Sequence, residues 1–178
     1  MLRGISNLDL VHSAQCLEQS VILIGIFLIV PLNAPEQPDS IQEVVYTRKL
    51  SHWKILLLRL AMSILLLIVM ICLFSGVMKW KNCIFPFVAY VAGTVISAMA
   101  LGCLGLAVSV AGNSAVAGYL ASTAYFLFNL LGEISDNSMF YLFSMGKGNY
   151  MTKISLLGWS ILMIAVSLIY IGYIGKRR

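Results

Sequence analysis

Residues 55–77 read ILLLRLAMSILLLIVMICLFSGV, an apolar run with a single charged residue, Arg59. About 20 apolar residues in an α-helix cross the hydrocarbon core of a bilayer. Apolar and polar residues do not alternate in this run, as they would in the strands of a membrane β-barrel. The run therefore predicts one membrane-spanning α-helix, and similar runs elsewhere in the chain predict further ones.

The whole chain has the composition of such a helix. Hydrophobic residues make up 60% of its 178 residues and charged residues 11%, whereas soluble domains are about one quarter charged. We therefore predict an all-α polytopic membrane protein, with about five transmembrane helices in a single transmembrane domain, residues 1–178. The other apolar stretches lie near 14–32, 84–110, 115–132 and 154–174.

Basic residues gather in two places beside the predicted spans. Arg48, Lys49 and Lys54 lie between the first two spans, and residues 176–178 follow the last. Short loops rich in Lys and Arg stay on the cytoplasmic side of a membrane. We therefore expect the first loop and the C-terminus to be cytoplasmic, in a protein of the cytoplasmic (inner) cell membrane. The net charge of +5 then reflects topology, and no nucleic-acid partner is expected.

The third and fourth predicted spans are separated only by residues 111–114, AGNS. Gly and Asn accept the backbone angles of a tight turn, so these spans should form a helical hairpin. Small residues that allow helix backbones to approach closely in lipid line both spans. They either pack helices within one subunit or form a subunit interface, and they are Ala98, Gly102, Gly105, Ala107, Gly118 and Ala121.

The stretch 133–153 mixes charged, glycine and aromatic residues, and its apolar part is too short to cross a bilayer. We interpret it as an outer segment that is either re-entrant or lies on the membrane surface. Phe140, Tyr141 and Phe143 within it are typical of the aromatic belt at a membrane interface.

The first loop, residues 39–53, reads DSIQEVVYTRKLSHW and has the pattern of a short amphipathic helix. Ser40 and Glu43 form a capping box, which satisfies free amides at a helix start. Ile41, Val44 and Val45 recur at helical spacing on one face. A short cytoplasmic helix of this kind either lies in the membrane interface or couples the spans to a soluble partner.

This stretch resembles the intracellular coupling region of the second type of ATP-binding-cassette (ABC) transporter permease, a family of bacterial exporter subunits with six spans. The family's order is an acidic residue, a hydrophobic-Glu-hydrophobic core, a serine and then a basic, apolar span. Residues 109–120, SVAGNSAVAGYL, also resemble the family's short turn between its fourth and fifth spans. Ser40 and Ile41 replace its Gly-Thr pair and Lys49 its proline, and the matching residues are Glu36, Glu43, Val44, Val45, Ser51, Lys54 and Arg59.

The resemblance runs from about Val21 to the C-terminus and implies a permease shortened by one N-terminal span. It implies cytosolic ATP-binding subunits as partners, with ATP and Mg held there, and a second permease copy or a different permease subunit. The coupling interface that it implies on this chain consists of Ser40, Ile41, Glu43, Val44, Val45 and Arg48.

Reactive residues give no pattern of catalysis or cofactor binding. The chain has no GxxxxGK[ST] loop to bind nucleotide phosphates, and both histidines, His12 and His52, lie near span ends. The four cysteines occur singly, without CxxC spacing, which is typical of free thiols. A Cys72–Cys83 disulfide stays open as an alternative if their loop faces an oxidising compartment. We expect neither an enzyme nor a cofactor or metal site in this chain.

Four polar residues near the outer ends of spans are candidates for a substrate path. Glu18 begins the first span, and Asn129, Glu133 and Asp136 lie at or beyond the end of the fourth. They either line a polar path or gate, or are simply solvated at the water boundary.

The residues leave two other functions open besides an ABC exporter permease. One is the ligand-capture membrane subunit of an uptake system, which would bind a small molecule tightly. The other is a noncatalytic membrane accessory protein, in which the first loop is only an interfacial anchor. No sequence feature identifies the substrate, or separates a homodimer from a heterodimer.

Overall fold

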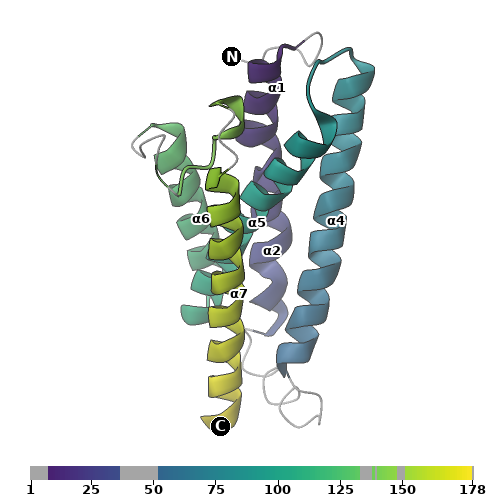
Figure 1. The fold of residues 1–178 in the computed structure, drawn as a ribbon. Helices are drawn as coiled ribbons and strands as arrows, with labels where there is room; N and C mark the ends of the chain where they lie inside the picture. Colours follow the sequence, from purple (N-terminus) through teal and green to yellow (C-terminus); the bar gives the residue numbers. More distant parts are fainter. Residues whose placement is uncertain (1–7, 37–51, 133–137, 139, 148–150, 178) are drawn as a thin grey trace.

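The computed structural model describes residues 8–36, 52–132, 138, 140–147 and 151–177, and every regular element in them is a helix (Figure 1). The predicted all-α class is therefore confirmed for these parts of the chain. The predicted coupling segment lies outside them, except that α4 begins at its second-last residue, His52.

The first span is built from four consecutive helical pieces. They are α1 (Leu10–Cys16), the π-helix η1 (Leu17–Val21), α2 (Leu23–Ile29) and the 3₁₀ helix η2 (Val30–Glu36). Together they give an apolar span over Leu10–Asn33, which begins four residues before the predicted start at 14. The polar residues at the start of this stretch made the predicted start too late. The helix is already formed there, since the amide of Ser13 donates to the carbonyl of Asp9 at 2.8 Å.

Four longer helices complete the bundle. Among the residues that the structure describes, the first span and three of these helices, α4, α5 and α7, are long and apolar enough to cross a membrane, whereas α6 is shorter. This is the construction of a polytopic membrane protein. The helices are α4 (His52–Trp80), α5 (Phe87–Ala111), α6 (Ala115–Leu130) and α7 (Met151–Arg177), and a 3₁₀ turn, η3 (Met145–Lys147), precedes α7.

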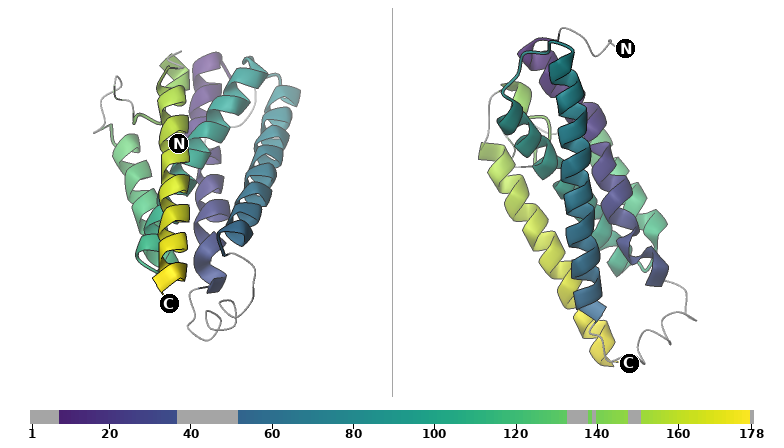
Figure 2. Two further views of the ribbon diagram at one scale, coloured as in Figure 1. Left: turned by 60° about the horizontal axis from the view of Figure 1, so that its bottom comes forward. Right: turned by 90° about the vertical axis from the view of Figure 1, so that its right-hand side faces the viewer.

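Helix α5 is the centre of the bundle. It packs against α2, α4, α6 and α7, and its apolar window is the most buried of the candidate spans. The other helices surround it, so that α4 and α7 keep wide apolar faces on the outside (Figures 1 and 2). A helix that is apolar all round and enclosed by others can only be a core element.

The two ends of the bundle differ in what they carry. The C-terminus, the end of η2 and the start of α4 lie at the lower end in Figure 1, and α1 lies at the upper end. The view from the side in Figure 2 agrees. The flanks of the first loop therefore lie at the same end of the bundle as the C-terminus. The predicted topology requires this, because one span separates the N-terminus from the first loop and five spans separate it from the C-terminus.

The predicted hairpin between α5 and α6 is confirmed. Asn113 adopts the left-handed conformation at φ 46°. The amide of Gly112 donates to the carbonyl of Val108 at 2.8 Å, and that of Ser114 to Ser109 at 3.1 Å. These bonds satisfy carbonyls at the end of α5, so the reversal of direction leaves few backbone groups exposed.

Small residues hold α5 against two neighbours within the one chain. A side chain at Gly118 of α6 would overlap the carbonyl of Gly105, which explains the close hairpin. The second contact was not predicted: Gly25 of α2 lies against Ala98 and Gly102 of α5. The small-residue stripe therefore serves packing within this subunit on both sides of α5.

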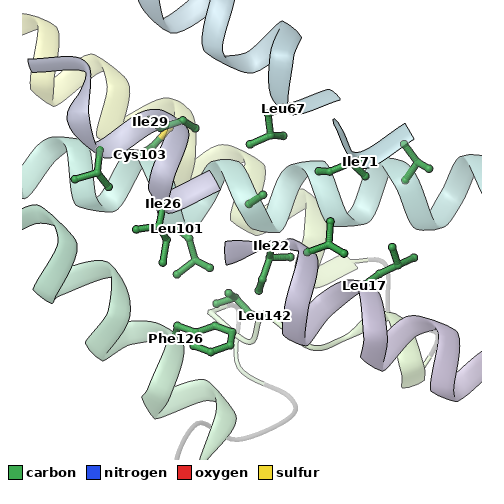
Figure 3. Close-up of a cluster of buried hydrophobic side chains, with 14 of the residues drawn as sticks. Leu17, Ile22, Ile26, Ile29, Leu67, Ile71, Leu101, Cys103, Phe126 and Leu142 are labelled. Atoms are coloured by element: carbon green, nitrogen blue, oxygen red, sulfur yellow. The ribbon is translucent and has the colours of Figure 1, made fainter. Parts of the chain in front are cut away.

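The apolar core runs along the first span and meets α5, α6 and α4. Figure 3 shows Ile22 and Ile26 near Leu101, with Phe126 and Leu142 below them, and Leu17 farther to the right. None of the four cysteines forms a disulfide, so the alternative of a Cys72–Cys83 disulfide does not hold in this structure.

Candidate functional site

Residues 140–146, here called the inserted segment, enter the upper part of the bundle instead of lying on its surface. Leu142, Ser144 and Met145 are buried, and the η3 turn packs against α1. Met145 occupies the space that a side chain at Gly93 of α5 would need. Because buried backbone groups are cut off from solvent, the amides and carbonyls of this irregular segment need partners within the protein.

Side chains of α6 and α7 supply some of those partners. The Leu142 amide donates to Oδ1 of Asn129 at 2.9 Å, and the Leu142 carbonyl accepts a bond from Nζ of Lys153 at 2.5 Å. The Tyr125 hydroxyl donates to the carbonyl of Phe140 at 2.5 Å. Two helices thus hold the backbone of a segment that has little secondary structure of its own.

Glu18 of η1 holds the other part of the inserted segment. Its Oε1 accepts the Met145 amide at 3.0 Å, and the backbone of Gly146 also bonds to this carboxylate. Met145 and Gly146 begin η3, so the carboxylate satisfies free amides at the start of this turn. Only 1% of the Glu18 surface is exposed.

Lys153, in the first turn of α7, completes the network. Its Nζ lies 2.7 Å from Oε1 of Glu18 and 2.6 Å from Oγ of Ser97 on α5, in addition to the Leu142 carbonyl. An ammonium group has three protons, and here three acceptors surround it. The pair is buried, since Lys153 is only 3% exposed. The ion pair and the hydrogen bonds of its two side chains therefore connect η1, α5, α7 and the inserted segment.

The π-helical form of η1 contributes to this geometry. A π turn contains one residue more than an α turn, and such turns are rare and often found at functional sites. In η1 it leaves both Leu17 and Glu18 buried, one in the apolar core and one in the polar network.

A pocket of about 200 Å³ lies beside the network, with room for several water molecules. It has a mixed lining of a carboxylate, amides and aromatic rings. The side chains that give it this character are Gln15, Glu18, Gln19, Asn129, Tyr141 and Phe143.

The structure brings together two of the four predicted polar-lining residues, because Glu18 and Asn129 both border this pocket. The alternative that they are solvated at the water boundary is wrong, since both are buried. Glu133 and Asp136 lie outside the described residues. The positions of the first two are set by their bonds to the inserted segment, which no sequence pattern reveals.

Sequence reasoning missed Lys153 and Ser97. Lys153 was assigned to the outer face just before a span starting at 154, but α7 begins at Met151 and carries Lys153 into the bundle. The available signal was an acidic residue in one apolar span and a lysine at the start of another, which can only be buried there together.

The six predicted coupling residues, Ser40, Ile41, Glu43, Val44, Val45 and Arg48, lie outside the described residues. The flanks of their segment are described. Nη1 of Arg59 on α4 donates to the carbonyl of Leu32 in η2 at 3.4 Å. This long bond connects the two spans that carry the segment.

Within the described parts of the chain, no three His, Cys, Asp or Glu side chains lie close enough to hold a metal ion. Comparisons of the chain with protein-family models, with curated proteins and with solved structures found no match. The function is therefore inferred from the residues and contacts of this chain itself.

Proposed function

We propose that this chain is the transmembrane permease subunit of an ATP-driven ABC exporter in the cytoplasmic membrane, coupled to separate cytosolic ATPase subunits. The main support is the charged amphipathic segment 39–53, with its capping box and apolar face. The described residues on either side of it, the end of η2 and the start of α4, lie at the end of the bundle that also carries the C-terminal part of α7 (Figure 1). A cytosolic partner that binds there reaches both spans at once.

Contacts of the described residues provide a route by which such a partner moves the bundle. The Arg59–Leu32 bond connects η2 with α4 beside the segment. Gly25 fits closely against Ala98, so a shift of α2 is passed to the central helix. Since α5 also packs against α6 and α7, motion at the first loop reaches the whole bundle.

The interface with the ATPase follows from the pattern of the segment. An amphipathic helix binds a groove through its apolar anchors, which are here Ile41, Val44 and Val45. Glu43 and Arg48 then set its orientation, while the Ser40 side chain fixes the helix start. ATP and Mg are bound and used in the partner. A second permease copy or a different permease subunit completes the transporter.

The experiment is a gentle detergent purification of the tagged protein from its native host, followed by mass spectrometry of co-purified proteins. A cytosolic protein with a phosphate-binding loop should be recovered, and the double substitution V44D/V45D should abolish its recovery. Q42D is the control for added negative charge, because it places a carboxylate on the polar face and should leave recovery unchanged. Recovery of the chain without such a protein would contradict the proposal.

The pocket beside Glu18 gives some support to a second function, the ligand-capture subunit of an uptake system. Its mixed amide, carboxylate and aromatic lining is the kind that orients small polar ligands. That function requires a small molecule to remain bound through purification. Native mass spectrometry that finds the chain at its bare mass would argue against it.

A further inference from the structure

The inserted segment is fixed by side chains from the surrounding helices more than by its own structure. Glu18 binds its Met145 amide, Asn129 its Leu142 amide, and Lys153 its Leu142 carbonyl. A segment held in this way leaves the bundle when a few side-chain bonds break, because no ladder of backbone bonds must be dismantled.

Two of these bonds depend on a single ion pair. The same atom, Oε1 of Glu18, accepts both the Met145 amide and the Lys153 ammonium. Lys153 in turn reaches the Leu142 carbonyl and Ser97 of α5. If Glu18 moves away, the η3 turn loses its cap and Lys153 loses its counter-charge in the same event.

Glu18 lies on η1, the π-helical piece of the first span. If the extra residue of the π turn is expelled, one flank of η1 rotates by about 100° and advances by about 1.5 Å relative to the other. A neighbour, Leu17 or Gln19, then takes the place of Glu18, and neither carries a charge to pair with Lys153. A one-residue shift in η1 therefore breaks the ion pair without unfolding a helix.

A pocket already lies beside the segment. It has a volume of about 200 Å³ and is bordered by Glu18 and by Tyr141 and Phe143 of the inserted segment. Behind the segment lie Gly93, in contact with Met145, and Ser97, bonded to the Leu142 carbonyl. Withdrawal of the segment would join the pocket to this face of the central helix.

We propose that the inserted segment is a removable plug at the upper end of the bundle, and that the Glu18–Lys153 pair is the latch that holds it closed. A register shift in η1 opens the latch. This inference goes beyond the proposed function, because it depends on contacts within one chain and not on an ATPase partner.

The test measures amide hydrogen exchange of the full chain, purified in detergent, by mass spectrometry. In E18Q, which preserves side-chain size, peptides covering 140–147 should exchange at least about tenfold faster than in the unsubstituted protein, since a buried ammonium is left without its counter-charge. Peptides of α6 should not change. The charge-swapped double variant E18K/K153E should also exchange fast, because a lysine at 18 cannot accept the Met145 amide and a glutamate at 153 cannot donate to the Leu142 carbonyl.

A disulfide provides the control for plug motion. A Cβ at Gly146 would lie 3.9 Å from that of Ala14 on α1, within the range of about 3.5–4.5 Å that a disulfide needs. We expect the oxidised A14C/G146C pair, in a background with the native cysteines replaced by alanine, to slow exchange at 140–147 and to abolish the effect of E18Q. Reduction of this disulfide should restore the effect of E18Q on exchange at 140–147.

Two results would overturn the proposal. One is equal exchange at 140–147 in E18Q and the unsubstituted protein. The other is a rise spread evenly over all helices, which would make the pair a support of the whole bundle and not a latch. If E18Q does not fold, the A14C/G146C protein with native Glu18 decides: identical exchange at 140–147 when oxidised and when reduced would also contradict a plug.

Discussion

The Glu18–Lys153 pair shows why single charged residues in apolar helices carry information. Burial of either charge alone would be costly, whereas the pair with its additional acceptors is satisfied. Such a pair adds little net stability over an apolar replacement, but it penalises every arrangement that separates the partners. Its main effect is therefore to specify one position of η1 relative to α7.

Removal of one partner should be far more harmful than removal of both. We expect K153M to lower the free energy of unfolding by about 3–5 kcal/mol, because Glu18 is then buried without a counter-charge. The double variant E18L/K153M should recover part of that loss, because it removes the unpaired charge but leaves the Met145 amide and the Leu142 carbonyl without these side-chain partners. Reversible unfolding in mixed detergent micelles gives both values.

The exposed Lys81 supplies the matched control for this comparison. K81M removes the same charge outside the network, and it should leave stability unchanged. Equal stability of K153M and K81M would show that Lys153 and Glu18 do not interact as described.

At the scale of elements, glycines decide how closely the helices pack. A Cβ at Gly25 would overlap the backbone of Ala98, whereas one at Gly158 on α7 would meet nothing within 4 Å. A larger side chain should therefore be tolerated at Gly158 but not at Gly25.

We expect G25V to destabilise the protein by about 1–3 kcal/mol, since the backbones of α2 and α5 must move apart. G158V should leave the melting temperature unchanged or slightly raised, because it removes a flexible residue from an outward-facing helix position. Thermal unfolding followed by circular dichroism compares them. A larger loss in G158V than in G25V would contradict the packing described for α5.

The helices themselves could be predicted from the sequence because apolar length alone defines a span. The tight turn at 112–114 was also predictable, since Gly and Asn accept its backbone angles. The π turn was not, because one extra residue in a helix leaves no periodic signal over five residues. Glu18 and Asn129 make their contacts with residues 140–146, which enter the bundle only in the folded protein. The sequence could therefore identify Glu18 and Asn129 as candidates, but not their partners.

At the scale of the whole molecule, the flanks of the first loop and the C-terminal part of α7 share one end of the bundle, and this sets the expected topology. Basic residues of both regions should face the cytoplasm, and the Lys81–Asn82 turn should face outward. In intact cells, an impermeant thiol reagent should label N82C but not Q42C or R178C, in a background without native cysteines. Labelling of Q42C together with N82C would place the first loop outside and exclude a cytosolic partner for it.

The central claim, that residues 39–53 bind a cytosolic ATPase, is tested most directly by photo-crosslinking in living cells. A photoreactive amino acid is placed at Val44, on the apolar face, and separately at Gln42, on the polar face. We expect the probe at position 44 to give a covalent adduct with a protein that carries a phosphate-binding loop, and the probe at 42 to give much less. Adducts of position 44 with lipid alone would contradict the account and leave the segment as an interfacial anchor.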